Sequence, residues 1–206
     1  PGEGRCREIE ACRSYYGNDT NRTVGEAGEM VGSRVSNPRA SIRERVDCVV
    51  DRAHGARVVT ASNDDENPRD VERLAVSGVD ISEYPITLET AERAAELGMT
   101  TVMGAPNLVR GESQWGNLAT ADGIDAGVVD VLVAYYHPPS LLASVFVDTG
   151  ESLPERVERV SANPAAAVGF ADRGRIEPGT RGDLIVVEPE PTPTVTSALV
   201  AGQPVY

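Results

Sequence analysis

The chain has 206 residues, of which 40% are hydrophobic, enough apolar material for the buried core of one large domain. Its formal net charge is −13, so neither nucleic acid nor an anionic membrane surface is an expected partner. All basic residues are arginine, and the absence of lysine excludes a Schiff base, a P-loop lysine and a carbamylated-lysine metal bridge.

The acidic composition also bears on the expected cellular environment. Carboxylates keep a surface hydrated when salt is concentrated, which favours a halophilic cytoplasmic protein; a GC-biased genome that replaces lysine by arginine is the alternative. Cys6, Cys12 and Cys48 are an odd number without a CxxC pair, which predicts reduced thiols. The sequence contains no apolar run of about 20 residues and does not open on a signal-peptide pattern, so we expect a cytoplasmic location.

The first 40 residues are rich in Gly, Arg, Ser and Asn and predict an irregular segment. A helix is predicted over 40–53, because apolar residues recur on one face, and two more over 68–77 and 87–97. Short β-rich runs separate and follow them, at 57–61, 79–82, 100–103 and 128–134. This alternation is typical of a parallel sheet with crossover helices. We therefore predict an α/β region over 41–170, with about four β/α units of a partial barrel.

The last part of the chain changes character. A helix is predicted from Pro154 to about residue 161, and a short alanine-rich helix follows it up to Val168. Beyond residue 170 the pattern is of turns and strands, with Gly179 in a tight turn and Asp183 bonding main-chain amides. We expect a small all-β tail over 171–206.

Polar residues follow each predicted strand, at the carboxyl ends where α/β proteins place their sites. Asp64 and Asp65 are candidate catalytic residues, because carboxylates bind a divalent metal or orient a ligand; capping the next helix is the alternative for one of them. Glu83 is expected to contact substrate or to pair with an arginine. His137 lies at the last strand end and is a weak candidate for a metal ligand, together with Asp64.

A loop after the third strand has the composition of a phosphate site. Arg110 and Gly111 combine a guanidinium fork with a glycine that lets main chain approach closely, and Asn107 precedes them. A salt bridge that braces the loop is the alternative for Arg110. Asn117 is expected to contact substrate or to cap the following helix.

Two sets of motifs resemble known proteins. The run NPA at 163–165, followed by GxIxxGxxGDL at 174–184, resembles the C-terminus of the amidohydrolase superfamily. Within that superfamily, ASNDD at 61–65, EYPITLE at 83–89 and MGAPNLVRG at 103–111 resemble the family that hydrolyses ribose 1-methylphosphonate 5-triphosphate to the 5-phosphate and diphosphate. The resemblance covers the chain from about residue 40 to its end.

This resemblance implies a fold and an activity. The fold would be the C-terminal half of a (β/α)8 TIM barrel, joined to the C-terminal strands of a small β-sandwich. The activity would be that of a metal-dependent hydrolase of phosphonate catabolism, with a phosphorylated sugar as substrate and Zn, Mn or Mg as the divalent metal. The remaining half of the barrel, or a second copy of the chain, would be the expected partner.

The sequence departs from the family at chemically demanding positions. Asn63 stands where the family has a probable metal-binding histidine, and Tyr135 where it has the aspartate that acts as ligand and general base. An amide is a poor zinc ligand, and a phenol with a pKa near 10 cannot accept a proton at neutral pH as a carboxylate does. These departures favour a catalytically degenerate homologue that binds phosphorylated ligands or partners. Another amidohydrolase, such as a deaminase or cyclic-amide hydrolase, is a third reading, disfavoured because it needs the same lost residues.

Overall fold

The computed structural model describes residues 23, 25–26, 29, 39–113 and 116–206. Most of the predicted irregular segment over 1–40, with Cys6 and Cys12, lies outside the described residues. No helix within the described ranges is long and apolar enough to span a bilayer.

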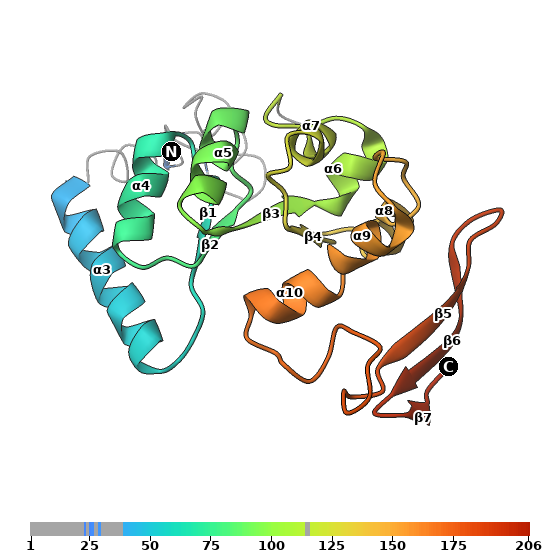
Figure 1. Ribbon diagram of the computed structural model, residues 1–206. Coiled ribbons are helices and arrows are strands. Elements are labelled where there is room, and N and C mark those ends of the chain that lie inside the picture. The colour runs from blue at the N-terminus through green and yellow to red at the C-terminus, as the bar shows by residue number, and fades with distance from the viewer. Residues whose placement is uncertain (1–22, 24, 27–28, 30–38, 114–115) are drawn as a thin grey trace.

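A four-stranded parallel sheet forms the centre of the α/β region (Figure 1). Its strands are β1 (Ala61–Asn63), β2 (Ile81–Glu83), β3 (Thr100–Gly104) and β4 (Val131–Val133), adjacent in chain order. Ser62 pairs with Ser82, Ser82 with Thr101, and Met103 with Leu132. The carboxyl ends of the four parallel strands therefore lie at the same end of the sheet. The predicted parallel arrangement is confirmed.

Helices connect the strands and continue beyond the last of them. The three helices on the N-terminal side are α3 (Arg39–Gly55), α4 (Pro68–Val76) and α5 (Leu88–Glu96). Five shorter ones follow: α6 (Ala105–Arg110), α7 (Thr120–Asp125), α8 (Pro139–Ser144), α9 (Leu153–Glu158) and α10 (Ala162–Ala167). The predicted helices over 40–53, 68–77 and 87–97 are found within a few residues of their expected ends.

Helix α4 corrects one expectation from the sequence. Asn67 is its N-cap, and the Asn67 side chain accepts a hydrogen bond from the amide of Asp70 at 3.2 Å. Asp64 and Asp65 lie before this cap and do not serve as one, because the helix begins only at Pro68. At α5 the expected cap is present, since Thr87 accepts from the amide of Thr90.

Three of the predicted strands, β1, β2 and β4, begin later than their sequences indicate. The amide and hydroxyl of Thr60 both donate to the carboxylate of Asp80, at 2.8 and 3.0 Å, so this side chain binds groups just ahead of Ala61, where β1 begins. Thr101 makes the same two contacts with Asp130, the residue that precedes β4. Aspartate side chains thus close the amino ends of these strand pairs.

The helices α6, α7 and α8 were not among the sequence predictions. α6 and α8 carry proline in their first turn, where its missing amide costs no hydrogen bond, whereas proline in the sequence suggests a loop. Each of the three has only six residues, too few for a hydrophobic period to be visible.

The core lies between the sheet and the helices that pack on it. One cluster is centred on Met103, which is fully buried with Leu108, Leu118, Ile124 and Leu132. A second joins α3, α4 and α5 through a set of fully or nearly fully buried side chains: Val50, Val71, Val79, Ala94 and Met99. The crossover helices are therefore held on the sheet by apolar burial.

A separate antiparallel sheet forms the tail, as expected. Its strands are β5 (Leu184–Glu188), β6 (Thr194–Val200) and β7 (Gln203–Pro204). Gly179 turns the chain before β5 with a φ of 93°, and Asp183 accepts from the amide of Ala201 at 2.8 Å. Both residues play the structural parts expected from their sequence.

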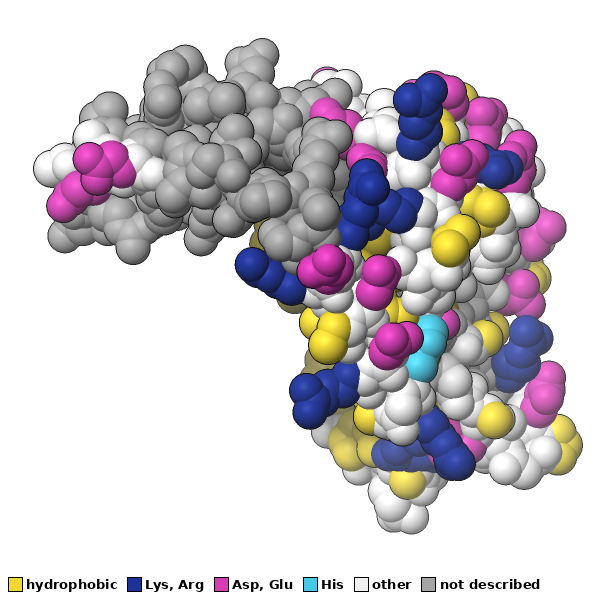
Figure 2. All heavy atoms as spheres, turned by 90° about the vertical axis from the view of Figure 1, so that its left-hand side faces the viewer, with side chains coloured by type: hydrophobic (Ala, Val, Ile, Leu, Met, Phe, Trp, Pro, Cys, Tyr) yellow, Lys and Arg dark blue, Asp and Glu magenta, His cyan; other side chains and the backbone are white. Residues whose placement is uncertain are grey.

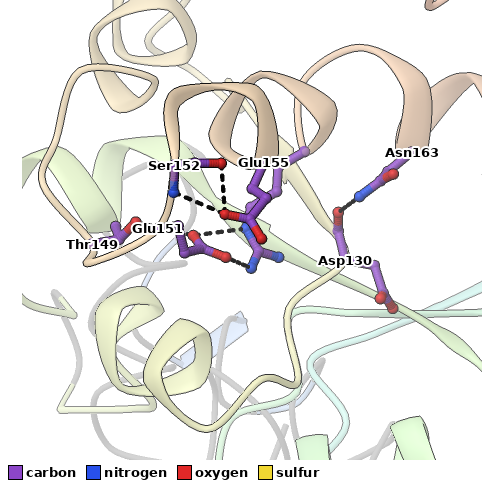
Figure 3. A network of polar contacts seen from close by, with 7 residues as sticks. Asp130, Thr149, Glu151, Ser152, Glu155 and Asn163 are labelled. Carbon is purple, nitrogen blue, oxygen red and sulfur yellow. Dashed lines mark hydrogen bonds and ion pairs between the residues drawn. The ribbon is translucent and has the colours of Figure 1, made fainter.

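The outer edge of β4 is covered by the chain's own later segment (Figure 3). The amide of Leu132 donates to the carbonyl of Arg159 at 2.9 Å, and the side-chain amide of Asn163 donates to the carbonyl of Asp130 at 2.9 Å. Arg159 is held in turn by a two-point contact with Glu151, and both side chains are largely buried. Two outward main-chain groups at this edge, the amide of Leu132 and the carbonyl of Asp130, therefore already have partners.

The segment that covers the β4 edge is itself ordered by a capping box at α9. The amide and hydroxyl of Ser152 both donate to the carboxylate of Glu155, at 2.8 and 2.7 Å. Thr149 donates to Glu151 at 2.9 Å and so joins the same network. Polar contacts over 149–163 thus fix the approach of this segment to the sheet.

The opposite edge, β1, pairs only with β2 among the described residues. An apolar groove of about 430 Å³ runs beside it between α3 and α4, and includes Val46, Val49, Leu74 and Val79 in its lining. The side of the molecule that carries α3 shows arginine and acidic side chains interspersed with apolar ones (Figure 2). Its charge is mixed, although the chain as a whole is acidic.

Candidate functional site at the strand ends

The chain bends sharply where three of the four strands end. Asp64 after β1, Tyr84 after β2 and Tyr135 beyond β4 have φ values of 59°, 58° and 48°. Residues other than glycine rarely adopt this left-handed conformation, and those that do are concentrated at functional sites. The three bends lie at the strand ends, where the sequence pattern predicts a site.

Glu83, at the end of β2, is the centre of this site. The side-chain amide of Asn63 donates to Glu83 Oε2, and the hydroxyl of Tyr135 also donates to the Glu83 carboxylate. Residues beside β1, β2 and β4 therefore meet at one carboxylate. The arginine partner considered for Glu83 is not found: within the described part of the chain, Glu83 makes no ion pair.

The environment of Tyr135 keeps its phenol protonated. Burial of the hydroxyl end, the hydrogen bond to Glu83 and the negative charge of Glu83 together raise the pKa of Tyr135 well above its ordinary value of 10.0. Tyr135 as a whole residue is 43% exposed, so burial is partial and acts together with Glu83. At this position Tyr135 is a hydrogen-bond donor and not a proton acceptor.

Tyr84 connects the site to the loop that follows β3. Its ring meets that of Tyr135 edge-on, with centroids 6.2 Å apart, and its hydroxyl lies 3.1 Å from Ser113 Oγ. Sequence patterns gave no sign of this role for Tyr84, because a lone aromatic after a strand usually reports only packing. The contact with Ser113 places the loop of Arg110 and Gly111 beside the strand ends.

Asp65 is a buried acid that joins β1 to β2. It is 6% exposed, and its Oδ2 accepts from the hydroxyls of Ser62 at 2.6 Å and Ser82 at 2.5 Å. Burial raises the pKa of Asp65, although the two hydrogen bonds act in the opposite direction. Both serines were missed in the sequence; the signal would have been a serine one residue before the end of two adjacent parallel strands.

Asp64 and Asp65 line a small acidic pocket at the end of β1. It has a volume of about 280 Å³ and is lined by Asn63, Asp64, Asp65, Glu66, Asp70, Arg73 and Leu74. Arg73 lies 3.6 Å from Asp70 and is the only basic residue in this lining. The pocket favours a cation or a hydrogen-bond donor over a free anion.

The other predicted substrate residues lie on or near α6. Asn107 is buried and bridges the structure: its amide donates to Tyr84 Oη and to the carbonyl of Leu118, and its oxygen accepts from the amide of Thr120, at 3.1 to 3.3 Å. These contacts use its hydrogen-bonding groups inside the protein. Asn117 is half-buried and does not cap α7, whose N-cap is Ala119.

Arg110 ends α6 on an exposed surface, and Gly111 follows with a φ of 85°. The guanidinium donates twice to the carbonyl of Glu112, at 3.2 and 3.0 Å. The salt bridge considered for it is not found, because Arg110 makes no ion pair with any described residue. Its charge faces solvent beside the strand-end site.

The donor set of this half does not fit a divalent metal. Among the described residues, no group of three or more His, Cys, Asp and Glu side chains is placed to hold one. His137, the other candidate, has its Nδ1 2.6 Å from Ser140 Oγ at the start of α8. Asn63 and Tyr135 present N–H and O–H groups to Glu83, whereas a metal needs lone pairs.

Gly104 is a position where one added methyl group should disturb the site. A Cβ there would lie 2.7 Å from Cε2 of Tyr135, although the backbone, with φ −84° and ψ 122°, accepts alanine. We expect Gly104→Ala to lower the free energy of unfolding by about 1 to 3 kcal/mol through overpacking. Chemical denaturation would measure this. Gly55→Ala is the control, because its Cβ meets nothing within 4 Å, and an equal effect of both changes would contradict the contact.

Comparison with known proteins places this geometry in a family. No family model matches the chain. It is 31% identical over 191 residues to the alpha-D-ribose 1-methylphosphonate 5-triphosphate diphosphatase of Escherichia coli (strain K12), an alignment that covers 90% of the chain. The chain spans 50% of the length of that relative.

Solved structures show the same fold. The crystal structure of A. niger ochratoxinase superposes with a TM-score of 0.60 at 18% identity, covering 79% of this chain and 44% of that one. A triazine hydrolase variant gives 0.56 at 16% identity, over 79% and 46%, and an uncharacterized metal-dependent hydrolase from Pyrococcus furiosus gives 0.52 at 15%, over 68% and 35%. By sequence and fold, the chain belongs to the family of the ribose 1-methylphosphonate 5-triphosphate diphosphatases in the amidohydrolase superfamily, and it corresponds to their C-terminal half.

Proposed function

We propose that this chain is a degenerate member of its family that binds a phosphorylated sugar at the strand ends without hydrolysing it. The observation that carries the proposal is the contact of Asn63 and Tyr135 with Glu83. Metal-assisted hydrolysis needs a Lewis acid and a group that takes a proton from water. In this half, a protonated phenol stands where the resemblance implies the proton acceptor.

The phosphate group would be recognised by Arg110. Its guanidinium is exposed, and its charge is not neutralised by any described carboxylate. The Tyr84–Ser113 contact holds the loop that contains Arg110 beside the strand ends. Gly111 has no side chain, so a phosphate could come close to the main chain there. The acidic pocket at β1 would accept the sugar hydroxyls as donors to Asp64 and Asp65, because an anion would be repelled there.

A diphosphate-release assay tests the absence of hydrolysis. The purified chain is incubated with ribose 1-methylphosphonate 5-triphosphate, with and without Mn²⁺ or Zn²⁺, and the E. coli relative serves as the positive control. We expect no release above background. Metal-dependent turnover that Asp64→Ala abolishes would overturn the proposal in favour of an active diphosphatase.

Titration calorimetry with ribose 5-phosphate tests the binding site. Arg110→Gln should weaken binding about tenfold or more, because a charge-assisted contact to phosphate contributes roughly 1.5 to 3 kcal/mol. Arg43→Gln is the matched control, since Arg43 is also exposed but lies on α3. Equal affinities for the two variants would remove Arg110 from the site.

A further inference from the structure

The strand-end cluster crosses the sheet. Glu83 belongs to β2 and Tyr135 follows β4, and β3 lies between these strands. To reach Glu83, the ring of Tyr135 passes over Gly104 at the end of β3, at the place where a Cβ would be 2.7 Å from the ring. The left-handed conformation of Tyr135, with φ 48°, turns its side chain back toward the sheet. Glycine at 104 and the bend at 135 are therefore both needed for the contact.

The cluster carries a single negative charge, which two neutral donors stabilise through hydrogen bonds. Glu83 provides one carboxylate, and Asn63 and Tyr135 each provide a neutral donor. These donors occupy lone pairs that a cation would need. Two carboxylates facing each other would need a cation or a shared proton between them, whereas one carboxylate with two donors does not.

We infer that Asn63, Glu83 and Tyr135 form a clamp that ties together the ends of β1, β2 and β4 without any metal ion. Because of this clamp (the Asn63–Glu83–Tyr135 cluster), the stability of the folded state does not depend on divalent cations. Tyr135 acts in it as a positioning residue and fixes Glu83. The inference rests on the proposed function and deepens it, because it assigns a structural role to Asn63 and Tyr135, which stand at positions where the resemblance implies a metal ligand and a general base.

Thermal unfolding tests the clamp in two ways. The melting temperature of the wild-type chain should be unchanged by EDTA, Mn²⁺ or Zn²⁺. Tyr135→Phe removes only the hydroxyl and should lower the melting temperature by roughly 4 °C, the shift expected from one lost charge-assisted hydrogen bond in a chain of this size. Tyr206→Phe is the matched control, since Tyr206 is 74% exposed at the end of the chain, and it should leave the melting temperature unchanged.

A gain-of-function variant tests the convergence of the three side chains. The double variant Asn63→His with Tyr135→Asp places an imidazole and a second carboxylate beside Glu83, which are zinc ligands. We expect Zn²⁺ to raise its melting temperature by several degrees and to bind at one ion per chain in calorimetry. A folded double variant that ignores Zn²⁺ would contradict the convergence.

Other results would overturn the clamp directly. They are metal retained at one ion per chain by the purified wild-type protein, a rise of its melting temperature with Mn²⁺ or Zn²⁺, or equal melting temperatures for Tyr135→Phe and Tyr206→Phe. These measurements need no ligand. Failure of ribose 5-phosphate to bind would therefore overturn the proposed function alone, and a metal response without diphosphate release would overturn the clamp alone.

Discussion

Val71→Ala is expected to lower the free energy of unfolding by about 2 to 3 kcal/mol, through the loss of two buried methyl groups and the cavity they leave. Val71 is 0% exposed, and it packs in the cluster that joins α4 to α3 and α5. The change leaves the strand-end site untouched. Urea denaturation followed by circular dichroism would give the difference from the shift in midpoint at constant slope.

Val76 offers a control on the same helix with the same chemistry. It is 89% exposed, so Val76→Ala removes no buried surface, and its effect should stay within about 0.5 kcal/mol. Similar losses for the two variants would mean that α4 does not pack against α3 and α5 as the structure has it.

Asp65→Ala is expected to lower the free energy of unfolding by roughly 2 to 4 kcal/mol. The carboxyl group accepts from Ser62 and Ser82, and its removal leaves both hydroxyls without this acceptor in a buried setting. Asp65→Asn should cost less, because the amide oxygen can still accept. An Asp65→Ala variant as stable as wild type would show that this link between β1 and β2 contributes little.

The same residue predicts a pH effect with a definite sign. Because the pKa of Asp65 is raised in the folded state above its ordinary value of 3.8, folding favours the protonated form. The associated stability is fully present below about pH 4 and is lost as pH rises through the folded-state pKa. Asp64 and Asp70 add negative charge in the same direction. As pH rises from 4 to 8, the free energy of unfolding of the wild type should fall relative to that of Asp65→Asn. A constant difference between the two free energies over that pH range would contradict the prediction.

The arrangement of the fold could be predicted because it rests on local patterns. Thr87 and Gly98 marked the limits of α5, and the apolar runs that became β2 and β3 lay between such signals. The exact start of β1 could not be predicted, since it depends on Asp80, which is 20 residues from Thr60. Such a contact exists only once the strands are adjacent.

The placement of polar residues at the strand ends could be predicted from the sequence, whereas the contacts between them could not. Asn63, Glu83 and Tyr135 could each be singled out from the sequence, but their meeting at one carboxylate depends on Gly104 leaving room over β3. Asn107 was predicted to contact substrate, and its side chain is hydrogen-bonded to residues 84, 118 and 120, so its role toward a ligand also stays a prediction. The roles of Asp64, Asn117 and Arg110 toward a ligand stay predictions.

The two edges of the parallel sheet differ in what they can accept. At β4 the carbonyl of Arg159 and the amide of Asn163 already occupy outward main-chain groups, while at β1 the described chain offers a strand edge beside an apolar groove. Head-to-tail stacking, in which β4 of one molecule joins β1 of the next, would have to displace these two contacts. Growth of an open-ended filament through this sheet would therefore lose the same hydrogen bonds at every junction.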